Sequence, residues 1–146
     1  MTEDVRMLLN ALAEVAGELL EKEGFFPPSG AVMTQDGEVN LLEPHDGEEG
    51  ENPEDLIVVL QEAFREAARE GTIRACAFSV DVQVENPETE EENEAILVSA
   101  EIQEGEAFDI FLPYVVGEEE VEMLQPFAMQ REAVVFVDRA DSPSPN

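Results

Sequence analysis

Hydrophobic residues recur with helical spacing in two segments of the chain. Aliphatic side chains fall every three or four positions in residues 3 to 23, between the candidate N-cap Thr2 and Gly24. A second stripe runs from the Asn52-Pro53 pair to Gly71. Asn and Pro are favoured at helix starts and Gly just after helix ends, so both segments are expected to be amphipathic helices.

Apolar and polar residues alternate in three later segments. The alternation covers Ile73 to Val84, Ala95 to Gln103 and Phe108 to Leu112, and short or acidic connections join the three. Successive side chains of a strand point to opposite faces, so a period of two predicts strands. We expect an antiparallel meander with one apolar face packed against the helices and one polar face in water.

Two shorter apolar runs and a later one complete the expected sheet. Asp36-Gly37 separates Ala31 to Met33 from Val39 to Leu42, which predicts a hairpin because glycine supplies the positive φ of an inverse turn. Residues 114 to 130 show no clear period and are expected to cross the surface. Ala133 to Val137 is expected to form a last strand that extends the sheet or pairs with another subunit.

Together these elements predict an α+β fold in the order α-β-β-α-β-β-β, followed by a short C-terminal strand. The antiparallel sheet should have about five strands, with the two amphipathic helices packed on it. We expect one domain over residues 1–138 and a disordered tail over residues 139–146, where Pro and Ser dominate.

Strong acidity changes what this fold is expected to do. The 146 residues include 36 Asp and Glu against 7 Lys and Arg, a formal net charge of -29. Affinity for nucleic acid comes mostly from Lys and Arg, so a nucleic-acid partner is excluded. The charge has two interpretations: a solvated surface adapted to high salt, or a surface for a basic partner, as in an immunity or inhibitor protein that mimics phosphate.

The acidic residues concentrate in loops, which are the candidate partner-binding segments. The candidates are Glu48 and Glu49 in the first loop and Glu88, Glu90, Glu91 and Glu92 in the second. Divalent-cation binding in the first loop has little support, because residues 46 to 55 match neither the spacing nor the glycine position of a calcium-binding loop.

Candidate catalytic chemistry is sparse. Asp81, Glu101 and Asp109 are weak candidates for a metal site or an acid and base pair, if they share the polar face of adjacent strands. His45 is a lone histidine beside acids, and Cys76 falls on an apolar strand face, so neither is expected to be catalytic. With no recognisable cofactor motif, we expect neither a catalytic residue nor a cofactor.

The order of the expected elements resembles that of Roadblock/LC7 and other profilin-like domains, over residues 25 to 112. The hairpin at Asp36-Gly37 carries most of that likeness. The segments at 24–27, 71–75 and 111–114 are similar to a family of small bacterial proteins with no assigned activity. The Roadblock likeness implies a non-catalytic regulator that dimerises through a helix or a sheet edge.

These observations favour a non-enzymatic interaction or regulatory protein, and a homodimer is expected. The alternatives are an immunity or inhibitor protein with a basic partner, and a carboxylate-based enzyme or divalent-metal binder. The N-terminus lacks the basic start of a signal peptide, no apolar run is long enough for a membrane span, and a single cysteine excludes an internal disulfide. We therefore expect a cytoplasmic location and no membrane partner.

Overall fold

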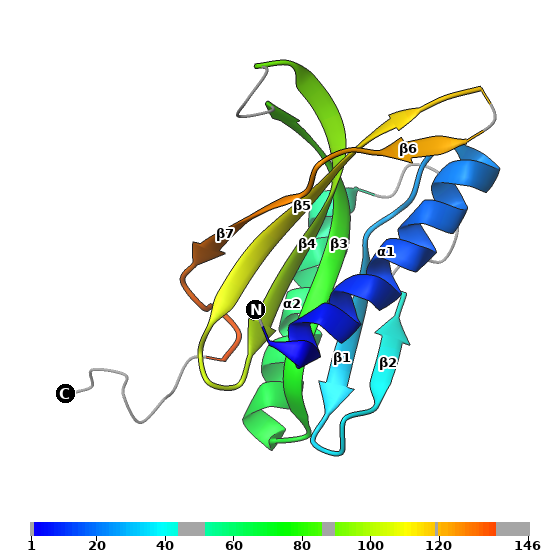
Figure 1. Cartoon of the computed structure of the whole chain (residues 1–146). Coiled ribbons are helices and arrows are strands. Elements are labelled where there is room, and N and C mark those ends of the chain that lie inside the picture. The colour runs from blue at the N-terminus through cyan, green and yellow to red at the C-terminus, as the bar shows by residue number, and fades with distance from the viewer. Residues whose placement is uncertain (1, 44–51, 86–89, 119, 137–146) are drawn as a thin grey trace.

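The described part of the protein contains two helices and one seven-stranded antiparallel sheet (Figure 1). The computed structural model describes residues 2–43, 52–85, 90–118 and 120–136. The elements in chain order are α1 (Glu3–Glu23), β1 (Ser29–Thr34), β2 (Val39–Leu42), α2 (Pro53–Glu70), β3 (Ile73–Glu85), β4 (Glu92–Ile102), β5 (Ala107–Val116), β6 (Val121–Met123) and β7 (Phe127–Arg131).

Both helices begin and end at the predicted capping residues. The Thr2 hydroxyl accepts a hydrogen bond from the backbone N–H of Val5, and the Asn52 side chain accepts one from the backbone N–H of Glu54. Gly24 and Gly71 adopt left-handed φ values of 80° and 74°, which end the helices without strain. The predicted amphipathic helices are confirmed. In the described part of the chain, neither has the length and apolar composition of a membrane span.

The predicted hairpin and meander are also confirmed, and the fold class is α+β. The sheet order is β2-β1-β3-β4-β5-β6, and β7 pairs with β5 beyond the end of β6. All pairs are antiparallel. The expected number of about five strands is too low, because two short strands follow β5.

Two predictions about the C-terminal third are wrong. Residues 114 to 130 do not simply cross the surface, since they contain the end of β5 and the strands β6 and β7. The segment Ala133 to Val137 is not a last strand: residues 134–136 form a bend, and Val137 lies outside the described residues. The reason for this bend is a carboxylate that binds its backbone, as described below. The tail at 139–146 also lies outside the described residues.

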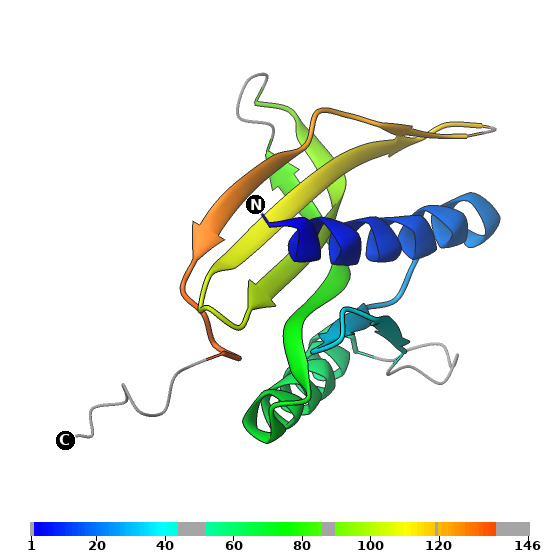
Figure 2. The ribbon, with the colours of Figure 1, turned by 60° about the horizontal axis from the view of Figure 1, so that its bottom comes forward.

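The helices cover opposite faces of the sheet, whereas the sequence suggested one face (Figure 2). The α1 stripe packs on small side chains of β3, including Ala75 and Ala77, and on aliphatic side chains of β4. These alanines and the buried Ser79 were expected to face water. Small residues instead let α1 approach the sheet closely, so this face is also a hydrophobic core.

On the other face, α2 packs mainly on β1 and β3. Its core contains Leu60 and Phe64 from the helix and Cys76, Phe78 and Val80 from β3. Figure 2 shows α2 to one side of the sheet, away from β5 and β7. The α2 side of β4, β5 and β7 is therefore the region where polar and exposed apolar side chains can gather.

Candidate functional site

A cluster of polar side chains lies on the α2 side of β4, β5 and β7. It consists of Ser99, Glu101, Asp109 and Arg131, which we call the Arg131 cluster. Ser99 pairs with Asp109 across β4 and β5, and Arg131 on β7 pairs with Ala107, the partner of Glu101. Residues paired across strands share a face, and so do residues two positions apart, so the register brings the four side chains together.

Arg131 joins the two carboxylates of the cluster. Its Nη1 donates to Glu101 Oε2 at 2.8 Å, and its Nε donates to Asp109 Oδ1 at 3.0 Å. The Ser99 hydroxyl donates to Asp109 at 2.7 Å and accepts from Arg131 Nη2 at 2.9 Å. Charge-assisted hydrogen bonds of this length are the strong ones in proteins, so one guanidinium fixes three strands at this point.

Glu101 also binds the backbone of the segment that follows β7. Its Oε2 accepts from the N–H of Val134 at 2.9 Å, and its Oε1 accepts from those of Val135 and Phe136 at 2.8 and 3.1 Å. The side chain is only 1% exposed. Three consecutive amides bound to one carboxylate cannot also form a strand ladder, which explains why residues 134–136 bend.

This arrangement leaves Glu101 little capacity for chemistry. A carboxylate has about four lone-pair sites, and four donors from Arg131 and the 134–136 backbone occupy those of Glu101. Removing any donor would leave a buried charge without full compensation. The geometry favours a structural role in which Glu101 holds the 134–136 segment against the sheet and α2.

The structure separates the three weak metal candidates. Glu101 and Asp109 lie in the Arg131 cluster, but Asp81 pairs with Ile96 and lies on the α1 side of the sheet. Across the described ranges, no group of three or more His, Cys, Asp or Glu side chains is arranged to hold a metal ion. The shared polar face that would have made these carboxylates one site is therefore absent from the described structure.

Asp81 belongs to a second polar cluster with Glu94 and Tyr114. The Tyr114 hydroxyl lies 2.9 Å from Asp81 Oδ1 and 2.8 Å from Glu94 Oε2. Tyr114 is only 2% exposed, and burial together with the two carboxylates raises the pKa of its phenol. Partial burial raises the pKa of Asp81 above its ordinary value, Glu94 adds to that rise, and the Tyr114 hydrogen bond opposes it.

Cys76 lines a small pocket together with residues of the Arg131 cluster. Gln61, Phe64, Ser99, Glu101 and Val135 are among the residues that line this pocket. Cys76 is 2% exposed, and burial and the Glu101 charge raise the pKa of its thiol far above the ordinary value. The thiolate that would be needed for nucleophilic attack is therefore disfavoured, in agreement with the sequence interpretation.

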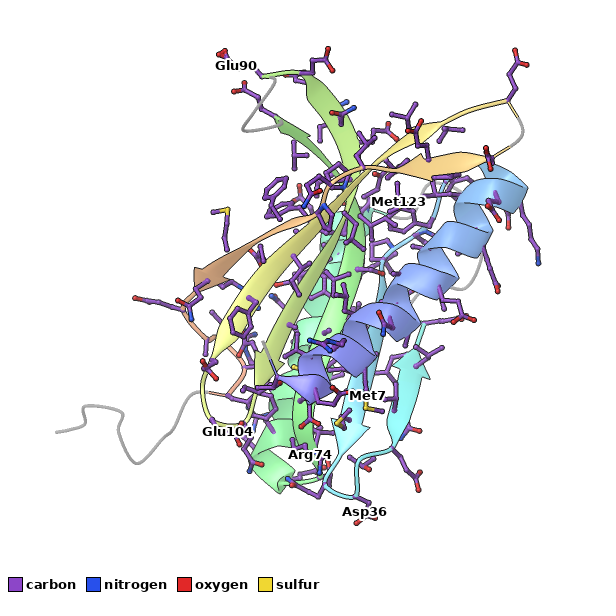
Figure 3. The ribbon with its side chains drawn as sticks, in the orientation of Figure 1. Met7, Asp36, Arg74, Glu90, Glu104 and Met123 are labelled. Carbon is purple, nitrogen blue, oxygen red and sulfur yellow. The ribbon has the colours of Figure 1, made fainter. Side chains whose placement is uncertain are left out.

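The candidate partner-binding glutamates are only partly described. Glu48, Glu49 and Glu88 lie outside the described residues, as does His45. Glu90 is exposed, and Figure 3 shows it at the outer end of the β3–β4 hairpin. Glu91 and Glu92 follow it, and β4 begins at Glu92. The hydrogen bonds that define the two clusters involve neither Glu90 nor Glu92.

A row of apolar side chains crosses the sheet beside the Arg131 cluster. The register aligns Val80, Leu97, Phe111 and Phe127 on β3, β4, β5 and β7. The rings of Phe111 and Phe127 stack with centroids 4.9 Å apart and an interplanar angle of 17°. Met129, on the same face, is 58% exposed. We call Leu97, Phe111, Phe127 and Met129 the open sheet face.

The open sheet face differs from the two cores in what covers it. Val80 and Leu97 pack against the α2 core, but among the described residues neither Phe111 nor Phe127 packs against either core. Val80 is buried, Leu97, Phe111 and Phe127 are half-buried, and Met129 is exposed. The local pattern does not mark this surface, because Phe111 falls on the strand face that was expected to be polar and β7 was not predicted.

Comparison with known proteins identified no relative of this chain. No family model, curated protein or solved structure matches the chain. The resemblances to Roadblock/LC7 domains and to a family of small bacterial proteins therefore stay predictions.

Proposed function

We propose that the protein is a non-enzymatic interaction protein of the cytoplasm that binds a positively charged partner protein through its open sheet face. The observation that carries this proposal is the stacked Phe111 and Phe127 pair beside the exposed Met129. Contiguous exposed apolar surface on a water-facing protein is typical of interaction sites. Aromatic residues and Met are enriched in protein interfaces, and aromatic side chains often supply much of the binding energy.

The position of these side chains also supports binding rather than core packing. Phe127 and Met129 lie on β7, which pairs with β5 at one end of the sheet. Among the described strands β7 pairs only with β5, so a partner placed on the open sheet face could contact the other edge of β7 as well, and strand edges with unpaired backbone groups readily accept another strand. The only charged residue of β7 is Arg131, whose guanidinium is engaged by the Arg131 cluster.

The net charge indicates the kind of partner. A chain of net charge -29 attracts basic proteins over distances of about a Debye length and repels a second copy of itself. Charge complementarity increases the association rate and disfavours wrong partners. A basic partner with apolar side chains that cover Phe127 and Met129 therefore fits this surface better than a homodimer does.

The Arg131 cluster supports a role without catalysis. In the Arg131 cluster, the described carboxylates are bound by donors of the chain itself, and an arginine cannot act as a general base at neutral pH. The thiol of Cys76 is buried and protonated. A group poised to exchange protons with a substrate would need to be weakly engaged, whereas both carboxylates of this cluster are bound by Arg131.

Site-specific photo-cross-linking tests the proposal. A photoreactive amino acid is placed at Met129 and, as a matched control, at the exposed neighbour Gln130, whose side chain points to the opposite face of β7. A third position at Glu90 tests the acidic loop that a phosphate mimic would use. Each variant is irradiated in an extract of the source organism, and the linked peptide is identified by mass spectrometry.

The proposal expects cross-links from position 129 to a basic protein, at a segment that contains both Lys or Arg and apolar residues. These cross-links should be rare from position 130, should decrease several-fold when Phe127 is changed to Ala, and should weaken at high salt. Links that arise mainly from position 90 would favour the immunity or inhibitor hypothesis. Links to a second copy or to an acidic protein would contradict the charge argument.

A further inference from the structure

Asp81, Glu94 and Tyr114 form a cluster whose hydrogen bonds need one proton more than the ionised side chains supply. Glu94 pairs with Tyr114 across β4 and β5, and Asp81 on β3 lies diagonally opposite Glu94 on the same face. Both carboxylates approach one hydroxyl, with Asp81 Oδ1 at 2.9 Å and Glu94 Oε2 at 2.8 Å from the Tyr114 oxygen. The hydroxyl is thus shared between two strands.

Counting donors shows where the shortage lies. A phenol donates one hydrogen bond, and an ionised carboxylate can only accept. If Asp81 and Glu94 are both ionised, only one of the two contacts contains a hydrogen, and in the other two oxygens meet with lone pairs. If one carboxyl is protonated, it donates to the Tyr114 oxygen while Tyr114 donates to the other carboxylate, and both contacts become hydrogen bonds.

Among the described residues, no cation forms a salt bridge with the three side chains of the cluster. The α1 face is lined by the apolar stripe of that helix, β1 begins at Ser29 opposite Ser79, and β6 places Met123 opposite Tyr114, while Asp81 and Glu94 are open to solvent. The charge of Glu94 adds to the rise in the pKa of Asp81. By contrast, the carboxylate pair Glu101 and Asp109 has Arg131 between its members.

Tyr114 keeps its proton, because deprotonation would remove the one hydrogen that the phenol supplies. Its side chain is buried beside two carboxylates, and the pKa of the phenol is raised, so the hydroxyl stays protonated. The pKa of Asp81 is also raised, first by partial burial and then by the Glu94 charge. Both shifts agree with the donor count, which stands on the geometry alone.

We propose that Asp81, Glu94 and Tyr114 form a proton-binding site: the folded protein holds one extra proton between the two carboxyls, and this proton links folding to pH. The proposal is independent of the proposed partner binding. A carboxyl whose pKa is higher in the folded state stabilises the fold when it is protonated. This stabilisation is full below the unfolded-state pKa and is lost as the pH rises through the folded-state pKa.

Carboxyl-carbon NMR titration measures this proton directly. Asp81 and Glu94 are expected to titrate as a coupled pair, whose upper step lies above the ordinary pH range of a carboxyl group. Asp36 is a matched reference because it is an exposed aspartate at the outer tip of the β1–β2 hairpin, far from the cluster (Figure 3). In the variant Asp81→Asn, Glu94 should lose its upper step and titrate once, at lower pH.

Thermal unfolding provides a second readout. Between about pH 4 and pH 7, the melting temperature of Asp81→Asn should rise relative to that of the wild type as pH increases, because the amide cannot ionise. The control Asp36→Asn removes the same charge and should show a much smaller trend. If Asp81→Asn does not fold, Glu94→Gln is the equivalent variant. Single steps for Asp81 and Glu94 at the pKa of Asp36, or equal trends in Asp81→Asn and Asp36→Asn, would overturn the proposal.

Discussion

Replacing Glu101 by Gln tests whether this carboxylate holds the C-terminal segment in place. The substitution keeps the volume of the side chain but removes its charge and one acceptor oxygen. The remaining carbonyl can still accept from Val135 and Phe136, whereas the new NH₂ group faces the donors of Arg131 and Val134. Two donors that face each other in a buried site cannot be satisfied, so we expect a large loss of stability.

The expected magnitude follows from the burial of the two partners. Removing one member of a buried ion pair costs about 3–5 kcal/mol, and a hydrogen bond to a charged group contributes about 1.5–3 kcal/mol. Glu101 is 1% exposed, but Arg131 is 23% exposed and keeps Asp109 as a partner, which places the cost near the lower end. We expect a loss of about 3 kcal/mol, or roughly 10 °C in melting temperature.

Urea unfolding of Glu101→Gln and Asp109→Asn provides the comparison. Both variants remove one negative charge, so the change in general repulsion is matched. Asp109 is 29% exposed, and an Asn carbonyl can still accept from Arg131, so Asp109→Asn should cost no more than about 1 kcal/mol. If the slope of the unfolding free energy against urea concentration is unchanged, the loss of stability does not come from a change in the denatured state.

Hydrogen exchange shows where the lost stability resides. In the wild type, the amides of Val134, Val135 and Phe136 should exchange slowly, because Glu101 accepts from all three. In Glu101→Gln they should lose protection before the strand amides do, whereas Asp109→Asn should leave them protected. The reasoning is refuted if Glu101→Gln costs less than about 1 kcal/mol, if both variants cost the same, or if these amides remain protected.

Three further predictions concern packing, reactivity and charge. A Cβ added at Gly30 would lie 2.6 Å from Leu60 and 3.1 Å from Phe64, so Gly30→Ala should destabilise the fold by about 1–3 kcal/mol in urea. Its control, Gly17→Ala in α1, meets no atom within 4 Å and should stabilise by about 0.5–1 kcal/mol. Burial and a raised thiol pKa predict that Cys76 reacts with a thiol reagent such as DTNB only after unfolding, and prompt labelling of the native protein would contradict this. Screening of the -29 charge predicts that the melting temperature rises as KCl is added, and a flat response would show that repulsion contributes little.

The helices and the central meander could be predicted because their signals are local. Thr2 and Gly24 enclose one helical stripe, and each lies within a few residues of the backbone groups that it satisfies or ends. The alternation in β3, β4 and β5 likewise needs only neighbouring positions. The two faces of the sheet were harder to assign, because Ala75, Ala77 and Ser79 are small rather than polar. Such residues fit a water-facing strand or a close helix contact equally well, and only the position of α1 distinguishes these cases.

The last strand was predicted wrongly because its own composition strongly favours β structure. Residues 133–137 have the sequence AVVFV, and β-branched and aromatic residues are enriched in strands. The competing interaction comes from Glu101, more than thirty residues away, whose carboxylate takes three consecutive amides. A propensity of a few tenths of a kcal/mol per residue cannot outweigh the cost of an uncompensated buried carboxylate.

The candidate site failed as a unit for a related reason. Asp81 and Glu101 each occupy a polar position in an alternating strand, but alternation does not relate the faces of two different strands. The register does: Asp81 stands opposite Ile96, and Glu101 stands opposite Cys76, so the polar positions of β3 and β4 point to opposite sides of the sheet. Glu101 is buried and is bound by Arg131, whereas the exposed Asp81 contacts Tyr114 on the other face. The same sheet thus holds one carboxylate pair bridged by Arg131 and another that no cation bridges among the described residues, and this asymmetry makes the titration of Asp81 and Glu94 informative.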